Sequence, residues 1–531
     1  MAPPQVIVTG TGLSREPQCD ILPSKSSGGV TTSANIRVVP AIRHKFHPSI
    51  LRANDVRGIV GKTLFSQDAY ILGKCIGTNI RERFRYDDGA NSTLDSKSNN
   101  NTRQYRVCVG RDGRLSSPSL ESALIDGLVS AGIHVLQVGI GPTPMIYFAE
   151  QLLSADAAVM VTGSHNPPPY NGFKISLRGK ALFDDDIREL GRIAESGCFA
   201  QGFVGLRHCV HHVEEEYVNY LIKDYRDHYI NDNSRKLKVA WDCGNGAAGD
   251  ICTKLRSQLP GEHILLNNTI DGSFPAHHPD PTVVKNLTQL ISTVRSNNCD
   301  LGVAFDGDAD RIGVVDGTGT VLWADQLLIL YAEEILEGHG SGASEKACVI
   351  ADVKASQSLF DTVERLGGRP VMCRTGHSLI KSQMREHNAP LAGEMSGHIF
   401  FADRFMGFDD AIYAALRLMG RLSVLNMTLA EWRKRITTPI NTPEMRLACP
   451  EERKWEVVDE VGERIRERTA VKCIEIDGLR VIHEDGWWLL RASNTESVLV
   501  VRVEANNEHS FQRLKADVAH QLQLSGFNLC F

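Results

Sequence analysis

Residues 106–138, RVCVGRDGRLSSPSLESALIDGLVSAGIHVLQV, carry the signals of a strand, a helix and a second strand in turn. Arg106–Gly110 and His134–Val138 are short apolar runs that predict buried strands. Between them, Ser117 is placed to cap a helix whose first turn contains Pro118, a position where proline is tolerated. One face of that helix would consist of Leu120, Ala123, Leu124 and Leu128. We therefore predict one strand–helix–strand unit of an α/β sheet.

The same alternation recurs further along the chain. Leu237–Trp241 predicts a strand that runs into a turn at Asp242–Gly246, and Cys348–Val353 predicts another strand. A helix from about residue 356 to 366 and a strand at Pro370–Cys373 follow. Repeated units of this kind predict α/β domains with substantially parallel sheets. In such sheets the catalytic and binding residues usually lie in the loops that follow the carboxyl ends of the strands.

Three parts of the chain break this pattern. Near the C-terminus, the strands Trp487–Arg491 and Val498–Val503 are joined by a tight polar loop, which predicts a smaller α+β domain. Residues 1–45 are rich in Pro, Ser, Thr and Gly, and residues 86–104 contain almost no apolar side chains. Because these two segments have too little apolar surface to offset the entropy of ordering them, we predict a flexible N-terminal tail and a disordered surface insert.

The composition limits the class of protein. Lys plus Arg number 58 and Asp plus Glu number 64, a net charge of -6, so the chain has no excess of cations for a nucleic-acid backbone. No uninterrupted apolar run reaches the roughly 18 residues that predict a membrane span. Residues 1–4 lack the basic and apolar regions of a signal peptide. The 13 cysteines include no C-x-x-C pair, which indicates reduced thiols. We expect a cytoplasmic protein that binds neither nucleic acid nor membrane.

A first candidate site follows the apolar strand Ala157–Val161. The next residues, Thr162–Pro167 (TGSHNP, the serine loop), present a hydroxyl beside an imidazole and an amide, and prolines stiffen the exit. Ser164, held on such a turn, fits a nucleophile or a carrier of a phosphoryl group. A turn that merely caps the strand explains these residues equally well.

A second candidate site follows the apolar run Leu301–Phe305. Its carboxylates, at positions i, i+2 and i+4, are Asp306, Asp308 and Asp310. They can converge on a cation where the backbone curls after a strand, and such hard oxygen ligands suit Mg²⁺ or Ca²⁺. An EF-hand is excluded, because its sixth position requires glycine but is Arg311, and its twelfth requires glutamate but is Gly317. A solvated acidic turn is the competing interpretation, which the crowding of three carboxylates beside an arginine disfavours. We call Asp306–Arg311 the aspartate loop.

Two further loops are candidates for ligand contacts. Glu394, Ser396 and His398 alternate on an extended loop (the sugar loop, Glu394–His398), so they can point the same way and contact sugar hydroxyls. Arg491–Ser497 (RASNTES, the phosphate loop) combines an arginine with hydroxyls, an amide and turn N–H groups that suit a phosphate. From the residues alone, a loop glutamate with a satisfied histidine is the commoner explanation of the first. An ordinary polar hairpin explains the second equally well.

In this order and spacing, the four loops resemble those of the α-D-phosphohexomutase superfamily, in particular its bacterial-type phosphomannomutase/phosphoglucomutase branch. The resemblance runs from about Pro48 to the C-terminus, interrupted mainly by residues 86–104. The other matching stretches are Asp55–Gly58, Gly110–Ser116 and Thr375–His377. The resemblance implies four domains around a central cleft, namely three α/β domains with mixed sheets and a smaller C-terminal α+β domain. After the N-terminal tail at 1–45, we place these four domains, in sequence order, at 46–209, 210–320, 321–438 and 439–531.

The resemblance also implies a task for each loop. Ser164 would be the phosphoserine, and one of its phosphate oxygens would hold a single Mg²⁺ together with Asp306, Asp308 and Asp310. The catalytic residues implied are Ser164, His398, Lys174, Arg57 and Arg311. The substrate-binding residues implied are Lys354, His377, Glu394, Ser396, His398, Arg491, Ser493, Asn494 and Thr495. Three aspartates around one divalent cation leave the site anionic, so the basic residues are needed to admit phosphate. His398 is the first candidate for proton transfer and Lys174 the alternative.

The implied reaction interconverts hexose 1-phosphate and hexose 6-phosphate, with mannose or glucose as the sugar. Hexose 1,6-bisphosphate would be both intermediate and activator. One alternative is a phosphoglucosamine mutase, whose sugar loop typically has glutamine where this chain has Met395. The other is a catalytically silent phosphosugar-binding protein, which the intact Ser164, aspartates and His398 disfavour. We expect a monomer whose partners are phosphosugars.

Overall fold

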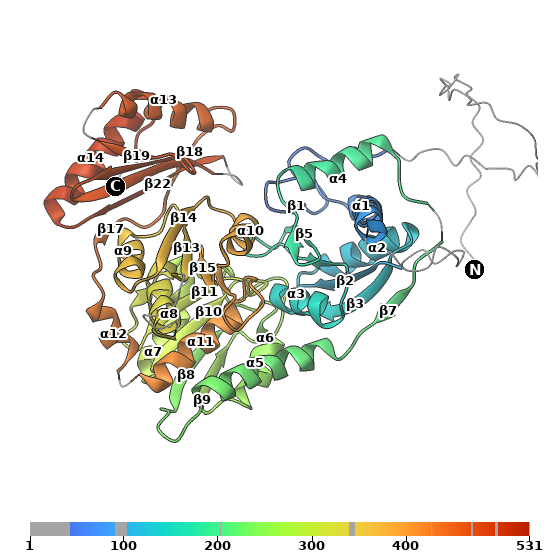
Figure 1. Ribbon diagram of the computed structural model, residues 1–531, viewed down its shortest axis with the longest axis horizontal. Coiled ribbons are helices and arrows are strands. Elements are labelled where there is room, and N and C mark those ends of the chain that lie inside the picture. The colour runs from blue at the N-terminus through green and yellow to red at the C-terminus, as the bar shows by residue number, and fades with distance from the viewer. Residues whose placement is uncertain are drawn as a thin grey trace, which may run out of the picture. The chain divides into compact units, whose positions relative to one another are not determined.

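The computed structural model describes residues 43–90, 104–201, 203–338, 346–425, 427–468, 471–493, 497–529 and 531. In sequence order these residues form three mixed α/β sheets and a C-terminal antiparallel sheet (Figure 1). The predicted fold class, three α/β domains followed by a smaller α+β domain, is therefore confirmed. None of the helices in these ranges is long and apolar enough to cross a bilayer.

The first sheet contains the unit quoted above. Its elements are β1 (Val56–Ile59), α1 (Ser66–Ala90), β2 (Arg106–Arg111), α2 (Ser117–Ser130), β3 (His134–Ile140), α3 (Thr143–Leu152), β4 (Ala157–Val161), β5 (Tyr170–Leu177), β6 (Lys180–Ala181), α4 (Asp185–Ser196) and β7 (Arg207–Cys209). The strand order is β1-β5-β4-β2-β3-β7, with β6 paired to β5. Neighbours from β4 to β7 are parallel, whereas β5 is antiparallel to β4 and β1. Helices α1 and α2 approach so closely that a side chain at Gly127 would collide with the main chain of Tyr70.

The second and third sheets repeat this mixed design. The second contains α5 (Val213–Tyr229), β8 (Leu237–Asp242), α6 (Gly249–Arg256), β9 (Gly261–Leu266), η1 (Val284–Leu287), α7 (Thr288–Ser296), β10 (Leu301–Phe305), β11 (Ile312–Asp316) and β12 (Val321–Leu322), in the order β12-β11-β10-β8-β9. The third contains α8 (Ala324–Gly338), β13 (Cys348–Asp352), α9 (Gln357–Arg365), β14 (Arg369–Cys373), α10 (His377–His387), β15 (Leu391–Gly393), β16 (Ile399–Phe401), α11 (Ala411–Val424) and α12 (Leu429–Arg435), in the order β14-β13-β15-β16. In both sheets the strand that precedes a candidate loop is central, so that loop leaves from the interior of the sheet.

The fourth sheet is antiparallel throughout. Its elements are β17 (Ile440–Asn441), β18 (Met445–Ala448), α13 (Lys454–Arg466), β19 (Lys472–Ile474), β20 (Leu479–His483), β21 (Gly486–Ala492), β22 (Val498–Ala505) and α14 (Glu508–Leu524). The strand order is β17-β22-β21-β20-β19, with β18 paired to β22. Helices α13 and α14 cover the same face of this sheet (Figure 1), so its other face is available for contacts elsewhere.

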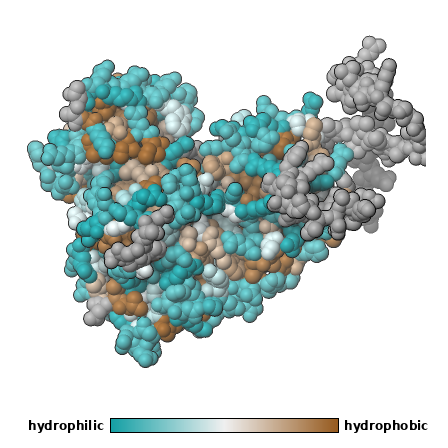
Figure 2. Space-filling model, in the orientation of Figure 1, coloured by the Kyte–Doolittle hydropathy of each residue, from teal (hydrophilic) through white to brown (hydrophobic). Residues whose placement is uncertain are grey.

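Part of the hydrophobic core of each of the first three sheets belongs to one shared cluster. One cluster of buried side chains includes Met160 of β4, Tyr217 of α5, Val303 of β10 and Phe401 of β16. The fourth sheet has its own cluster, which includes Trp488. By contrast, the face of the molecule seen in Figure 2 is mostly hydrophilic, with smaller apolar patches. The shared core holds β4 and β10 in one packed unit, which allows the loops that follow them to meet.

Both predicted flexible segments, the tail at 1–45 and the insert at 86–104, are shorter than expected. Helix α1 continues to Ala90, into the segment 86–104 that was predicted to be a disordered insert. Extending a helix that is already packed requires little free energy per residue, so polar composition alone placed this boundary too early. The described chain begins at Arg43, and the ring of His44 lies 2.7 Å from the carboxylate of Asp68, so residues 43–45 do not belong to a free tail. The rest of both segments, residues 1–42 and 91–103, lies outside the described residues.

Candidate active site

The serine loop and the aspartate loop meet. They follow β4 and β10, each at the carboxyl end of its strand. The Ser164 hydroxyl donates a hydrogen bond to Oδ2 of Asp306 at 2.9 Å, across 142 positions of sequence. Ser164 is only 2% exposed and has a φ of 48°, a left-handed conformation that a residue other than glycine adopts only under constraint. The hydroxyl is therefore held beside the aspartates by its surroundings.

A buried arginine supplies that constraint. The guanidinium of Arg114 donates to the main-chain carbonyls of Ser164 and Asn166 at 2.6 Å each, Pro167 at 2.8 Å and Tyr170 at 3.1 Å. Its Nε bonds to Oδ2 of Asp112 at 3.1 Å, and the same carboxylate accepts from the Thr162 hydroxyl at 2.8 Å. Arg114 and Asp112 both lie in the Gly110–Ser116 stretch, but no role was predicted for either.

The three aspartates form a site that suits a divalent cation. All are fully buried, and a carboxylate oxygen from each lies within 4.8 Å of the others. Oδ1 of Asp308 has no hydrogen-bond partner among the described residues. Burial and the charges of the other two aspartates raise the pKa of Asp306 well above its ordinary value, which shows a local shortage of positive charge. A hard cation with oxygen ligands would satisfy both deficits.

Two basic residues, Lys174 and Arg311, border this anionic cluster, and a third, Arg57, contacts the serine loop. The Lys174 ammonium donates to Oδ2 of Asp308 at 2.7 Å and also to Asp310. Burial alone would lower the pKa of Lys174, but the charges of these aspartates raise it above its ordinary value, so Lys174 keeps its proton. Arg57 donates to the side chain of Asn166 in the serine loop. Arg311 places its Nε 3.4 Å from Nε2 of His398.

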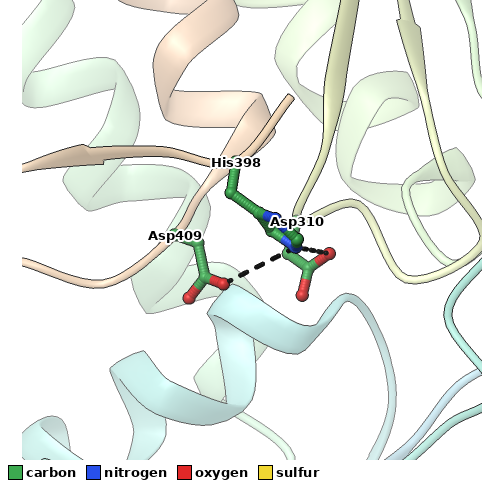
Figure 3. Close-up of side chains that lie close together, drawn as sticks. All are labelled: Asp310, His398 and Asp409. Atoms are coloured by element: carbon green, nitrogen blue, oxygen red, sulfur yellow. Dashed lines mark ion pairs between the residues drawn. The ribbon is translucent and has the colours of Figure 1, made fainter. Parts of the chain in front are cut away.

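His398, the last residue of the sugar loop, contacts Asp310 of the aspartate loop (Figure 3). Its Nδ1 is 2.8 Å from Oε2 of Glu394, and its Nε2 is 3.2 Å from Oδ1 of Asp310 and 4.0 Å from Oδ2 of Asp409. Burial lowers the pKa of His398, but the charge of Asp310 and the hydrogen bonds to Asp310 and Glu394 outweigh it and raise the pKa to about 9. His398 is thus a buried imidazolium at neutral pH, able to donate a proton.

The other sugar-loop residues are organised around this imidazole. The Ser396 hydroxyl lies 2.9 Å from Nδ1 of His398, and the His377 ring stacks on the His398 ring at 5.3 Å. Burial opposes ionisation of Glu394, but its hydrogen bond to His398 and the charge of His398 lower its pKa to about 2. The predicted residues Glu394, Ser396, His377 and His398 therefore form one cluster, and Asp409, 3.4 Å from Nδ1 of His377, belongs to it without having been predicted.

The remaining predicted residues lie at or near the fourth sheet. The Lys354 ammonium is 3.0 Å from Oε2 of Glu444 and 3.5 Å from Oδ2 of Asp352. Arg491 bonds to the two carboxylate oxygens of Asp477 at 3.1 and 3.2 Å, and Ser493 is buried. The other two phosphate-loop residues, Asn494 and Thr495, lie outside the described residues.

Matches to known families agree with this geometry. Four models of phosphoglucomutase/phosphomannomutase match the chain in order: α/β/α domain I at residues 48–201, α/β/α domain II at 215–319, α/β/α domain III at 323–439 and the C-terminal domain at 444–521. The chain belongs to the phosphoglucomutase/phosphomannomutase family. It is a phosphohexomutase, and below we number its domains by these four matches.

The relatives of this phosphohexomutase include bacterial and archaeal proteins. A phosphomannomutase/phosphoglucomutase of Pseudomonas aeruginosa is 41% identical over 90% of this chain and 96% of the relative. A phosphoglucomutase of Neisseria meningitidis is 40% identical over 88% and 95% of the two chains. A probable phosphoglucosamine mutase of Thermococcus gammatolerans is 33% identical over 86% and 95%. The crystal structure of a Burkholderia thailandensis family protein, 38% identical, superimposes with a TM-score of 0.80 over 92% of this chain and 100% of that one.

Proposed function

We propose that this phosphohexomutase interconverts the 1-phosphates and 6-phosphates of mannose and glucose, by way of phosphorylated Ser164 and a hexose 1,6-bisphosphate. The observation that supports this most directly is the 2.9 Å hydrogen bond between the Ser164 hydroxyl and Asp306. It places a buried nucleophile against a cation site, which is the arrangement that phosphoryl transfer through a serine requires. The names of the Pseudomonas and Neisseria relatives favour mannose and glucose as the sugars.

Asp306, Asp308 and Asp310, with a phosphate oxygen of phosphorylated Ser164, would hold one Mg²⁺. When bound, the ion supplies positive charge to the phosphoryl group in transfer. Arg57, Lys174 and Arg311 add positive charge from this chain. Because charge on the transferred group is spread over its equatorial oxygens, positioning and neutralisation of this kind supply most of the catalysis.

The proposed transfer breaks the bond from phosphorus to the Ser164 oxygen and forms one to O6 of a bound hexose 1-phosphate. The O6 proton passes to the neutral fraction of His398, and the released serine oxygen takes up a proton from solvent. After the bisphosphate turns end for end, the phosphoryl group on O1 returns to Ser164. In that step the Ser164 hydroxyl returns its proton to solvent, His398 gives its proton to O1, and hexose 6-phosphate leaves. Lys174 is disfavoured as the proton carrier, because two aspartates already share its ammonium.

The substrate contacts complete the proposal. Glu394, Ser396 and His398 would bind the sugar hydroxyls, with His377 and Lys354 beside them. Arg491, Ser493, Asn494 and Thr495 would hold whichever phosphate is not reacting. We assign the serine, aspartate, sugar and phosphate loops to domains at 46–209, 210–320, 321–438 and 439–531, in that order.

Steady-state assays of the purified enzyme, with Mg²⁺ and a trace of glucose 1,6-bisphosphate, test which hexose phosphates it converts. We expect kcat/KM values for mannose 1-phosphate and glucose 1-phosphate that agree within about tenfold, because the two sugars differ only at the 2-hydroxyl. Glucosamine 1-phosphate should be a markedly poorer substrate. A preference for glucosamine 1-phosphate would establish the phosphoglucosamine mutase alternative, which the Thermococcus relative represents. Turnover of none of the three sugars would refute the proposal.

A further inference from the structure

One turn in domain III makes hydrogen bonds both within domain III and to domain IV. Asp352–Ala355 joins β13 to α9 and carries Lys354. Its N–H groups bond within domain III: Val353 N donates to the Cys373 carbonyl at 2.9 Å, and Ala355 N donates to the Asp352 carbonyl at 3.0 Å. The carbonyls of Val353, Lys354 and Ala355, by contrast, accept hydrogen bonds from arginines of domain IV. The main chain around Lys354 is therefore held from domain IV.

Two arginines make these bonds. Arg480 on β20 donates to the carbonyls of Val353 at 2.7 Å and Ala355 at 2.8 Å. Arg502 on β22 donates to the Lys354 carbonyl. Both arginines pair in register with Leu489 of β21, so they lie in one row across three strands. Because Arg491 lies on β21, the turn and the phosphate loop are anchored on the same sheet.

The contact is a packed interface. Arg480 is fully buried, and its guanidinium lies 3.7 Å from the centre of the Trp487 ring. Val353, Trp487 and Leu489 form a shared apolar cluster around it. Burial lowers the pKa of Arg480 to about 9, which shows how unfavourable the site is for a charge. The two hydrogen bonds to the carbonyls of Val353 and Ala355 offset part of that cost.

The side chain of Lys354 is held from the same domain. Its ammonium lies 3.0 Å from Oε2 of Glu444, the first residue of the domain IV match. The charge of Lys354 lowers the pKa of Glu444 to about 2, so Glu444 stays ionised. Domain IV thus contacts Lys354 at its ammonium and at its main chain.

We infer that Arg480 and Glu444 are positioning residues that hold the side chain and main chain of Lys354 in the orientation that contacts the phosphosugar. Residues of domain IV thereby control a substrate contact that domain III makes. The inference rests on the proposed function, in which Lys354 contacts substrate. It adds that the phosphate loop and Lys354 act as one unit, because both are anchored on the sheet of domain IV. A shift of domain IV either carries the turn with it or breaks the bonds to its carbonyls.

A double-mutant cycle tests the inference, because coupled residues give non-additive effects. Arg480→Lys, which shortens the reach to the two carbonyls, should lower kcat/KM for glucose 1-phosphate about tenfold, mainly by raising KM. In a Lys354→Ala background, Arg480→Lys should lower kcat/KM by less than about twofold. Arg513→Lys is the matched control, because Arg513 forms an exposed ion pair with Asp485 in the same domain. It should leave kcat/KM unchanged in both backgrounds.

Each result decides the question. Equal fold-losses from Arg480→Lys in the two backgrounds would overturn the inference and leave Arg480 a stabilising residue, while the proposed function would stand. If Lys354→Ala alone has no effect on kcat/KM, Lys354 is not a substrate contact, and the inference falls together with that part of the proposed function. If Arg480→Lys does not fold, Glu444→Gln replaces it in the same cycle. Glu444 is part-exposed, and the same non-additivity is expected of it.

Discussion

The hydroxyl oxygen of Ser164 lies 2.9 Å from a carboxylate oxygen of Asp306, although 142 positions separate the two residues. The two loops leave the carboxyl ends of β4 and β10, strands whose side chains share one continuous core. The pairing therefore depends on packing between sheets as much as on the loops themselves.

Removing the metal should abolish catalysis. With excess chelator, we expect turnover of glucose 1-phosphate to fall by at least about a hundredfold, because the aspartate loop then lacks the charge that phosphoryl transfer needs. Added Mg²⁺ should restore it. Asp308→Asn, which removes one buried carboxylate, should raise the Mg²⁺ concentration required for half-maximal rate. Full activity in chelator would contradict the assignment of the aspartate loop.

His398→Gln should lower kcat by about 10²- to 10⁴-fold, the usual contribution of general acid–base catalysis. Glutamine keeps a polar side chain toward Glu394 but has no titratable proton. Steady-state kinetics with glucose 1-phosphate measure the loss, and His509→Gln on the exposed side of α14 is the control. A loss of less than about tenfold would mean that another group transfers the proton.

Arg114→Ala should destabilise the enzyme by about 3–5 kcal/mol, because it leaves the buried Asp112 without its charged partner and frees three carbonyls of the serine loop and the carbonyl of Tyr170. Urea unfolding measures the change. Arg188→Ala, which breaks an exposed ion pair with Asp185, should cost less than about 1 kcal/mol. Equal effects of the two substitutions would show that Arg114 does not hold the loop.

Asp410 should make folding stability depend on pH. Its carboxylate caps α11 and accepts from the Tyr217 hydroxyl at 2.8 Å, and burial raises its pKa to about 7. The folded state therefore binds a proton that the unfolded state has lost above about pH 4, so this contribution to stability falls as the pH rises from about 4 to 7.

Asp410→Asn removes the charge, while its Oδ1 can still accept from the Tyr413 N–H and its Nδ2 can donate to the Tyr217 hydroxyl oxygen. Relative to the wild type, it should raise stability by up to about 4 kcal/mol at pH 8 and change it little at pH 4. Urea midpoints measured at the two pH values check this. An identical pH dependence in the two proteins would place the titration elsewhere.

The sequence predicted those parts of the molecule in which a local pattern carries the information. Apolar runs located β2, β3, β8 and β13, and the strand-end loops of Ser164 and of the three aspartates were recognisable from residue type and spacing. Polar composition placed the start of the insert at 86, but α1 continues to Ala90, because a packed helix tolerates polar residues in its last turn.

The residues that the sequence did not reveal act on the main chain of distant segments. Arg114 bonds carbonyls 50 to 56 positions away, and Arg480 bonds carbonyls 125 and 127 positions away. Every residue has a carbonyl, so such partners leave no pattern of residue types. Asp409 and Glu444 join the site only through tertiary packing. For Arg114 alone a signal existed, namely its place in the Gly110–Ser116 stretch.

The central claim is that Ser164 carries the phosphoryl group, and peptide mass spectrometry tests it most directly. After incubation with glucose 1,6-bisphosphate and Mg²⁺, we expect one phosphoryl group on Ser164. It should remain there during turnover of added glucose 1-phosphate, because each catalytic cycle returns a phosphoryl group to Ser164. Ser164→Ala should show neither the adduct nor measurable turnover. A mutase that turns over with its phosphoryl group on another residue, or with no adduct at all, would contradict the account.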